Sequence, residues 1–277
     1  MSAPYFVDPQ TLFASLLGPK PPILVDVRRP ELVAQSDRLL PGSRLADHGD
    51  GPALAAQLDR GRPIVVACAY GHNRSQRVAA HLRCEGFSVS LLAGGVEAWA
   101  EAGLPLVKRS ASGVVLGDRP TCWITRRRPK IDRVACPWLI RRFLDPRARF
   151  LFAEPDQIMA IAADEGAIAY DLPGAPFEHE GDACTFDTLL KAFGLDGDPH
   201  LLALARIVRG ADTDRLDLTP QSAGLVAVAL GFSARFGDDD HAVLRHGIPV
   251  YDALHTWLRE ARQERHNWPR PAAGRAA

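Results

Sequence analysis

The first hundred residues alternate short apolar runs with amphipathic stretches, and this pattern restricts the fold more than any other feature. Apolar residues dominate segments 23–27, 64–68 and 88–92, which predicts three buried strands. Helical periodicity predicts helices at residues 10–17, 52–58, 75–85 and 96–102. Strands that alternate with helices are typical of a mainly parallel sheet flanked by helices. Residues 1–108 are therefore predicted to form an α/β domain.

The pattern changes after residue 108. Residues 109–120 show no apolar periodicity and are predicted to form a linker. A predicted strand at 121–125 then precedes predicted helices at 132–144, 155–163, 184–193, 199–209, 220–236 and 251–265. We therefore expect a mainly helical α+β domain over 121–268 and a disordered Pro-, Gly- and Ala-rich tail over 269–277. A length of 277 residues agrees with two domains of ordinary size.

The sequence contains no apolar run of about 18 residues and no apolar leader at its start. We therefore expect a soluble cytoplasmic protein without a membrane partner. The five cysteines are an odd number at irregular spacing, so they predict free thiols rather than a disulfide framework.

Positive charge is concentrated in one segment, although Lys+Arg and Asp+Glu both total 33. Residues 119–149 contain ten basic residues but only Asp132 and Asp145 as acidic ones, a local net charge of +8. Such a segment indicates an anion site or a nucleic-acid face. The alternative is that half of these arginines are solvated or paired with acidic residues in the rest of the chain.

A cysteine, Cys68, ends the predicted strand 64–68, just before the predicted helix at Ser75. Backbone N–H groups and the helix dipole attract an anion at such a helix start, which favours a thiolate nucleophile. Arg74 adds a planar donor fork suited to oxyanions. Cys68 and Arg74 are thus the predicted catalytic residues, and the predicted anion-binding residues are Tyr70, Gly71, His72, Asn73 and Ser75.

Three blocks in this part resemble the rhodanese family. They are Asp26-Val27-Arg28, the Cys68 loop, and Leu92-Ala93-Gly94-Gly95-Val96-Glu97-Ala98-Trp99 with Ala102-Gly103-Leu104-Pro105. The resemblance implies a rhodanese-like fold and a sulfurtransferase, in which Cys68 accepts sulfur as a persulfide and passes it to a thiol acceptor. Asp26 and Arg28 would support the site.

The loop reads Cys-x-x-Gly-x-x-Arg, one residue longer than the usual rhodanese spacing. This longer form resembles the loops of rhodanese-fold arsenate reductases and cell-cycle phosphatases, which hold tetrahedral oxyanions. Two reactions therefore stay open, sulfur transfer and thiol-dependent oxyanion reduction. The expected small-molecule partners are thiosulfate, a persulfide or chromate.

The C-terminal part resembles the ChrB-type chromate-resistance family. The resemblance is carried by 123–146, Phe177-Glu178-His179-Glu180-Gly181-Asp182, Cys184-Thr185-Phe186-Asp187, 207–214 and Val250-Tyr251-Asp252-Ala253-Leu254. It implies a role in resisting or sensing chromate, but it brings no catalytic residues with it.

Two further candidate sites come from the C-terminal residues themselves. Cys136 lies near a predicted helix start among arginines, so we expect a depressed pKa and a second redox thiol facing the Cys68 loop. The alternative is a small packing residue beside Trp138. A loose donor set predicts a divalent Zn, Fe or Mn site with His179 and Asp212 as preferred ligands; it comprises His179, Asp182, Asp187, Asp212 and Asp214. The alternative makes Asp182 a helix N-cap and pairs Asp187 with Lys191.

Three functions compete at this point. The leading hypothesis is a thiol enzyme coupled to a chromate-resistance domain. The second is a chromate-responsive transcription regulator that binds DNA phosphates through residues 119–149, although no helix-turn-helix is evident in the sequence. The third is an inactive fold that serves protein interactions, against which the intact Cys68 argues.

Overall fold

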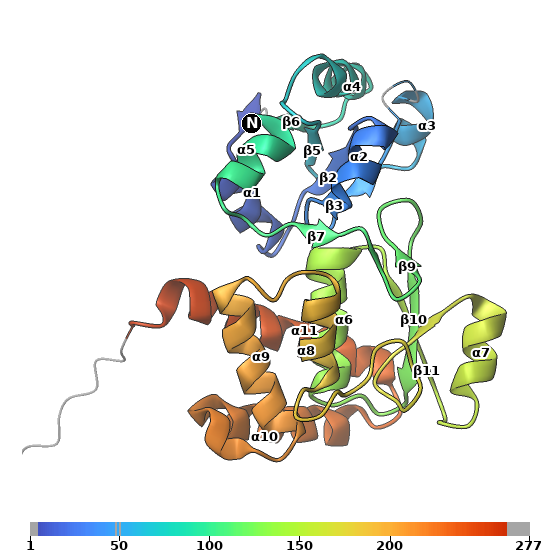
Figure 1. Ribbon diagram of the computed structural model, residues 1–277, viewed down its shortest axis with the longest axis vertical. Helices are drawn as coiled ribbons and strands as arrows, with labels where there is room; N and C mark the ends of the chain where they lie inside the picture. Colours follow the sequence, from blue (N-terminus) through green and yellow to red (C-terminus); the bar gives the residue numbers. More distant parts are fainter. Residues whose placement is uncertain (1–4, 48, 50, 265–277) are drawn as a thin grey trace, which may run out of the picture.

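The computed structural model describes residues 5–47, 49 and 51–264. Its N-terminal part contains a five-stranded sheet in the order β1-β6-β5-β2-β4 (Figure 1). The strands are β1 (Phe6–Val7), β2 (Ile23–Asp26), β4 (Arg44–Leu45), β5 (Ile64–Ala67) and β6 (Val89–Leu92). All four strand pairings are parallel, as the sequence pattern predicts.

Helices cover both faces of this sheet because successive strand residues point to opposite sides. Leu24 and Val65 pack in the same apolar cluster as α1 and α5, whereas Val25 and Val66 pack in the cluster of α3 and α4. The helices are α1 (Pro9–Leu16), α2 (Pro30–Ser36), α3 (Gly51–Ala56), α4 (Asn73–Cys84) and α5 (Gly95–Glu101). The predicted α/β fold is confirmed, with α2 as a helix that the sequence pattern did not reveal.

The segment predicted as a linker is structured. β7 (Val107–Lys108) pairs antiparallel with β3 (Arg38–Leu39), and β8 (Ser110–Ala111) forms a hairpin with β9 (Val114–Val115). Val114 and Leu116 are buried. Strands of two residues are too short to show a period of two in the sequence, which explains why this structure was missed. The domain boundaries themselves stay a prediction.

The C-terminal part combines a small parallel sheet with many helices. The sheet order is β11-β10-β12, formed by β10 (Cys122–Arg126), β11 (Arg149–Ala153) and β12 (Ile168–Ala169). The helical segments are α6 (Asp132–Leu139), η1 (Ile140–Leu144), α7 (Ile158–Glu165), α8 (Thr185–Ala192), α9 (Pro199–Asp212), η2 (Leu216–Leu218), α10 (Pro220–Phe236), α11 (Asp240–Thr256) and η3 (Trp257–Ala261). This agrees with the predicted mainly helical α+β fold.

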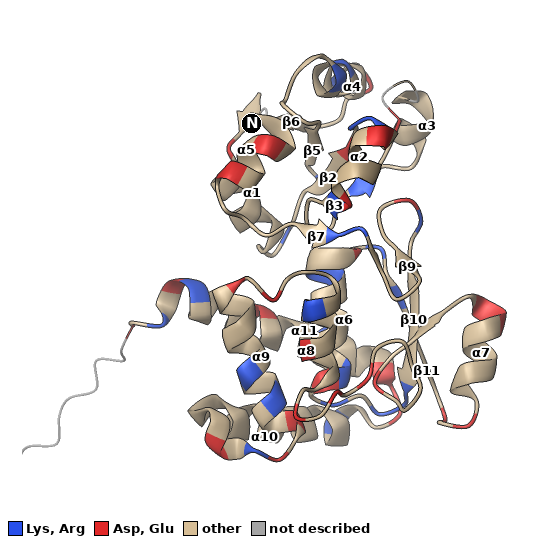
Figure 2. Cartoon of the chain, in the orientation of Figure 1, with Lys and Arg blue, Asp and Glu red and all other residues tan. Residues whose placement is uncertain are grey.

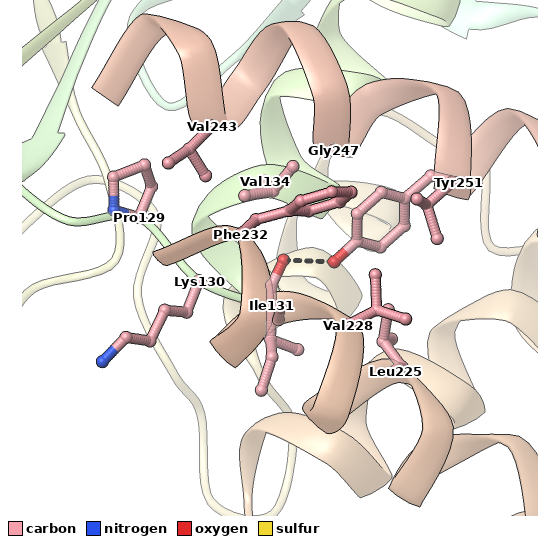
Figure 3. Close-up of a pocket in the computed structure, with 12 residues that line it drawn as sticks. Pro129, Lys130, Ile131, Val134, Leu225, Val228, Phe232, Val243, Gly247 and Tyr251 are labelled. Carbon is pink, nitrogen blue, oxygen red and sulfur yellow. Dashed lines mark hydrogen bonds between the residues drawn. The ribbon is translucent and has the colours of Figure 1, made fainter. Parts of the chain in front are cut away.

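Helix α11 begins 11 residues before the predicted helix at 251–265. Gly247 and Pro249 inside it are poor helix formers and hide its first turns from sequence patterns. Gly247 has a packing role, since a Cβ there would lie 2.7 Å from Val134 Cγ1 on α6. The glycine therefore lets α11 approach α6 closely (Figure 3).

The two parts of the chain meet near β7 and the end of α6 (Figure 1). Gly42 donates a main-chain hydrogen bond of 2.7 Å to Phe143, and Lys108 donates one of 2.9 Å to Phe193. One apolar cluster contains Trp99 from the N-terminal part and Trp138 from the C-terminal part. The two parts thus share a packed interface rather than a free hinge. Within the described residues no helix is long and apolar enough to cross a membrane, and the predicted tail 269–277 lies outside them.

Candidate functional site

Cys68 lies directly after β5, at the amino end of α4. Cys68 is only 6% exposed, and its Sγ lies 3.2 Å from the hydroxyl oxygen of Ser75. The same hydroxyl donates to the carbonyl of His72, the residue that caps α4. The thiol is therefore enclosed by the first turn of the helix, with Ser75 in hydrogen-bond distance of the sulfur.

The first residues of helix α5 hold the Cys68 loop through main-chain hydrogen bonds. Val96 N–H donates to the Cys68 carbonyl at 2.9 Å, and Glu97 N–H donates to the Ala69 carbonyl at 3.0 Å. Gly95 has φ +67°, and a Cβ there would overlap both carbonyl oxygens, so no other residue fits without displacing the loop. The N–H groups of residues 69–74 donate no hydrogen bond to any described residue. They are therefore available to an anion at the amino end of α4.

The loop is shorter than the sequence suggests, because α4 begins at Asn73 and not at Ser75. Arg74 consequently lies in the first turn of the helix. Its Nε donates to the Val27 carbonyl at 3.0 Å, which anchors the side chain at the end of β2. Together with Arg28 it lines a pocket of about 250 Å³.

The other loop candidates divide by exposure. Gly71 is buried with φ +74°, where a Cβ would lie 3.0 Å from the Leu92 carbonyl oxygen. Tyr70, His72 and Asn73 are exposed, and the rings of Tyr70 and His72 have centroids 6.1 Å apart. These three side chains form the outer rim of the loop.

Asp26 and Arg28 form a buried ion pair at the end of β2. Arg28 Nε donates to Asp26 Oδ2 at 2.9 Å, and Arg28 Nη2 donates to the Arg38 carbonyl at 2.7 Å. This pair braces the chain that follows β2, which is a structural contribution to the site.

A second polar cluster lies in the C-terminal part. His179 Nε2 lies 3.2 Å from Asp171 Oδ1, 3.4 Å from Asp212 Oδ2 and 3.5 Å from Asp132 Oδ2. Asp132 opens α6, Asp171 follows β12, and Asp212 ends α9. Ligand atoms of Asp132, His179 and Asp212 all lie within 4.8 Å of one another, so these residues could hold a metal ion.

Mutual proximity changes the pKa values in this cluster. The hydrogen bond to Asp132 and the nearby carboxylates raise the pKa of His179 to about 9. Burial, followed by the charges of Asp132 and Asp171, raises the pKa of Asp212 to about 7. The His179 side chain is 42% exposed while that of Asp132 is 1% exposed, so the cluster opens to solvent on the histidine side.

Residues 10–102 match the family model of the rhodanese-like domain, and residues 123–258 match that of the ChrB C-terminal domain. This chain is a rhodanese-like domain joined to a ChrB C-terminal domain. The rhodanese-like part is 31% identical over 102 residues to a sulfurtransferase of Allochromatium vinosum, covering 36% of this chain and 92% of that protein. The ChrB part is similar to protein ChrB of Cupriavidus metallidurans, with 38% identity over 141 residues.

That match covers 51% of this chain and 42% of the Cupriavidus protein, so the chain spans less than half the length of this relative. Solved structures similar to the rhodanese-like domain include a rhodanese-related protein of Thermoplasma volcanium, at 22% identity and a TM-score of 0.33 over 39% of this chain and 98% of that one. A rhodanese-like domain protein of Staphylococcus aureus has 28% identity and a TM-score of 0.33, over 38% of this chain and 97% of that one.

The expectation of a depressed pKa for Cys136 in the ChrB domain is wrong. Its side chain is fully buried, and Sγ donates to Asp132 Oδ1 at 3.3 Å. Burial and the neighbouring carboxylate raise the pKa of this thiol well above its ordinary value. The helix turns Cys136 inward toward Asp132 rather than outward toward the arginines. It therefore lacks the environment expected of a redox thiol.

The contacts around α8 differ from the N-cap and the ion pair expected for Asp182 and Asp187. Asp132, not Asp182, accepts the first free N–H groups of α8, from Thr185 at 2.8 Å and Phe186 at 3.0 Å. Asp182 instead lies 3.1 Å from Arg215. Asp187 pairs with Arg209 at 3.8 Å rather than with Lys191, which lies near Glu180. Asp214 is exposed and forms no part of the His179 cluster.

Sequence reasoning found His179 and Asp212 but missed Asp132 and Asp171 as their neighbours. The available signal was position, since Asp132 begins a predicted helix and Asp171 follows a short apolar run. Tyr251 fixes the turn that presents Asp132, because its hydroxyl donates to the Ile131 carbonyl at 2.7 Å (Figure 3). Ile131 has φ +30°, an unfavourable conformation for a β-branched residue that such a contact stabilises. The cavity around this bond, about 10 Å³, is too small for a ligand.

Ion pairs compensate much of the charge in residues 119–149. Basic and acidic residues lie close together in the ChrB domain (Figure 2). The paired arginines of this segment are Arg126, Arg127, Arg128, Arg133, Arg142 and Arg147. Five of these six arginines pair with carboxylates outside the segment, whereas Arg147 pairs with Asp145 inside it, so much of the local positive charge is balanced by other parts of the fold.

Proposed function

We propose that the rhodanese-like domain is a thiol enzyme in which Cys68 is the nucleophile and sulfane-sulfur transfer is the reaction. The observation that carries the proposal is the enclosure of Cys68 Sγ at the amino end of α4, 3.2 Å from Ser75 Oγ. The loop that follows this thiol has N–H groups without partners in the described chain, and these would favour negative charge on an anionic donor. The sulfurtransferase similar to this domain supports the same reaction.

The reaction has two displacements. The Cys68 thiolate attacks the sulfane sulfur of thiosulfate or a persulfide, a new S–S bond forms, and the donor's S–S bond breaks. Sulfite or a thiolate leaves with the electron pair. An acceptor thiolate then attacks the outer sulfur of the Cys68 persulfide and restores the Cys68 thiolate. The loop N–H groups would stabilise the charge on sulfur in each step.

The Cys-x-x-Gly-x-x-Arg spacing, one residue longer than the usual rhodanese spacing, favours thiol-dependent reduction of a tetrahedral oxyanion as a second candidate. In that reaction the oxyanion is the oxidant and a small-molecule thiol is the reductant. Both candidates require Cys68, so they differ in substrate rather than in nucleophile. Free cysteines throughout the described chain are consistent with a reducing compartment, and we propose the cytoplasm.

Mass spectrometry after thiosulfate treatment tests the proposal. We expect an adduct of about 32 Da, one sulfur atom, on Cys68 that a thiol removes. The Cys68→Ser variant should lose sulfite release, whereas Cys84→Ser, which changes an exposed cysteine, should retain it. An adduct on Cys84 alone, or full turnover by Cys68→Ser, would show that Cys68 is not the nucleophile.

The regulator hypothesis predicts tight DNA binding through the basic segment. The ion pairs within this segment disfavour that function, since paired guanidinium groups attract phosphates less strongly. We expect random duplex DNA to bind with a dissociation constant weaker than about 1 µM at physiological salt. Sub-micromolar binding with a steep salt dependence would favour the regulator.

We also propose that Asp132, His179 and Asp212 hold a divalent Zn, Fe or Mn ion. One imidazole and two carboxylates are a donor set that these metals accept, and the open side at His179 leaves room for water.

Elemental analysis after incubation with each metal and gel filtration tests this site. We expect about one ion per chain, lost in Asp212→Asn and retained in Asp182→Asn, which changes an exposed acidic residue. Equal metal content in these two variants would identify the cluster as an ion-pair network only.

A further inference from the structure

A pocket of about 380 Å³ lies between the rhodanese-like domain and the ChrB domain. The rhodanese-like domain contributes the start of β2 and the loop around Gly42, and the ChrB domain contributes the segment that follows α6. Gly42 has φ +64°, and a Cβ there would lie 3.0 Å from Pro146 Cγ. Because a main-chain hydrogen bond joins Gly42 to Phe143, both walls of the pocket are held in place.

Arginine side chains from both domains line this pocket. They are Arg44, Arg62, Arg141, Arg142 and Arg147. Two of the five have carboxylate partners, Arg142 with Asp252 at 2.6 Å and Arg147 with Asp145 at 3.4 Å. Asp59 is the acidic residue in the lining, and it is exposed and accepts from Gly61 N–H. The pocket therefore carries a surplus of positive charge.

Arg44 is the unusual member of this set. It is only 9% exposed, and its buried Nε and Nη2 have no hydrogen-bond partner within the described part of the chain. By contrast, Arg62 donates to the Pro21 carbonyl at 2.6 Å. Buried guanidinium donors are almost always paired, because leaving them without a partner is strongly unfavourable. The third guanidinium nitrogen, Nη1, is not among these enclosed atoms and has no partner within the described residues, so it is the donor that Arg44 offers to the pocket.

The electrostatics agree with this geometry. Burial lowers the pKa of Arg44 to about 10, with a further contribution from the positive charges of Arg147 and Arg62. The group is still charged at neutral pH and is repelled by its neighbours. A bound anion would offset this repulsion, and guanidinium groups match tetrahedral oxyanions in geometry.

We propose that this pocket binds a ligand with a multiply charged tetrahedral oxyanion group, held by Arg44 with Arg62 and Arg147. The group has two sources, a free inorganic oxyanion or a phosphorylated organic molecule. A volume of about 380 Å³ and a wall that contains Pro22, Leu24 and Pro146 leave room for an organic portion beside the charge.

This site is separate from Cys68. The pocket lies at Ile23 and Leu24, where β2 begins, whereas Arg74, in the helix turn that follows the Cys68 loop, contacts Val27 just beyond the end of β2. The start and the end of β2 lie at opposite ends of the strands of the parallel sheet. The proposal therefore does not depend on sulfur transfer, and the bound anion would instead bridge the two domains.

Calorimetric and thermal-shift titrations of the full chain test the proposal. One arm uses inorganic phosphate, sulfate and chromate, and the other uses AMP and ATP, all at equal ionic strength set with chloride. Arg44→Met retains the apolar stem and removes the donors, and Arg119→Met changes an exposed arginine of the basic segment as the matched control. Cys68→Ser is titrated in parallel to exclude binding at the thiol loop.

We expect at least one arm to raise the melting temperature of the wild type, Arg119→Met and Cys68→Ser alike. Arg44→Met should bind at least about tenfold more weakly. Without ligand, this variant should have an unchanged or higher melting temperature. Saturation by inorganic ions identifies a free oxyanion, and binding of the nucleotides alone identifies an organic phosphate. Absence of binding in both arms, or equal affinity in Arg44→Met, overturns the proposal. If Arg44→Met does not fold, Arg62→Met replaces it with the same criteria.

Discussion

His255 on α11 should make the protein sensitive to mild acid. His255 is 2% exposed, and its ring lies against those of Trp138 and Phe143 with centroid distances of 5.3 and 6.0 Å. The Nε2 atom is buried without a hydrogen-bond partner in the described chain. Protonation of this ring in the folded state would place a charge in an apolar environment that cannot solvate it.

The direction of the effect follows from the pKa values. Burial, followed by the positive charge of Arg259, lowers the pKa of His255 from 6.5 to about 4, although Asp198 and Asp252 act in the opposite direction. The unfolded chain therefore takes up a proton as the pH falls through 6.5, whereas the folded chain does so only near 4. Stability present above pH 6.5 is lost progressively between these two values.

The magnitude can be worked from the same shift. A difference between 6.5 and about 4 corresponds to about 3 kcal/mol when protonation is complete, at about 1.4 kcal/mol per pKa unit. At pH 5 the unfolded histidine is almost fully protonated and the folded one is not, which gives a loss of about 2 kcal/mol relative to pH 7.

Urea denaturation at pH 7 and pH 5 measures this loss. The wild type should lose about 2 kcal/mol more free energy of unfolding on acidification than His255→Leu, which removes the titrating ring. His246→Leu, an exposed histidine on the same helix, should behave as the wild type. Raised pKa values elsewhere, as at His179, act equally in all three proteins. Identical pH dependence in the wild type and His255→Leu would refute the reasoning.

Three further predictions follow from burial and contacts. Iodoacetamide should label the exposed Cys84 in the native protein but leave the buried Cys136 unmodified, as peptide mass spectrometry would show. Gly95→Ala should displace the Cys68 carbonyl and lower sulfite release from thiosulfate about tenfold or more, measured as initial rates. Asp145→Ala should lower the free energy of unfolding by about 3 kcal/mol in urea denaturation, because it leaves buried donors of Thr121 without an acceptor.

Each of these three predictions has an outcome that would contradict it, and the two stability and activity predictions have a control variant. Gly197→Ala adds a Cβ in open space and should leave sulfite release unchanged, so an equal loss in both glycine variants would contradict the steric argument. Asp156→Ala changes an exposed residue, and a destabilisation as large as that of Asp145→Ala would contradict the role of buried hydrogen bonds. Native labelling of Cys136 would contradict its burial.

The sequence alone determined the architecture around Cys68. The predicted strand 64–68, the loop and the helix are contiguous, so local patterns contain nearly all of the information that places the thiol. The parallel α/β sheet follows from the same short-range periodicity. The exact start of α4 and the resulting anchor of Arg74 on Val27 were not determined in this way, because helix starts depend on contacts that a periodicity does not contain.

The tertiary structure alone decided how the charged groups are combined. His179 and Asp212 were visible as donors, but Asp132 joins them only because α6, α8 and α9 pack together. The same packing turned Cys136 inward and reversed the expected direction of its pKa shift. Likewise, Arg44 and Arg147 meet across the domain interface although they are distant in sequence. Charge and pKa depend on burial and on neighbours through space, and packing between distant segments sets both.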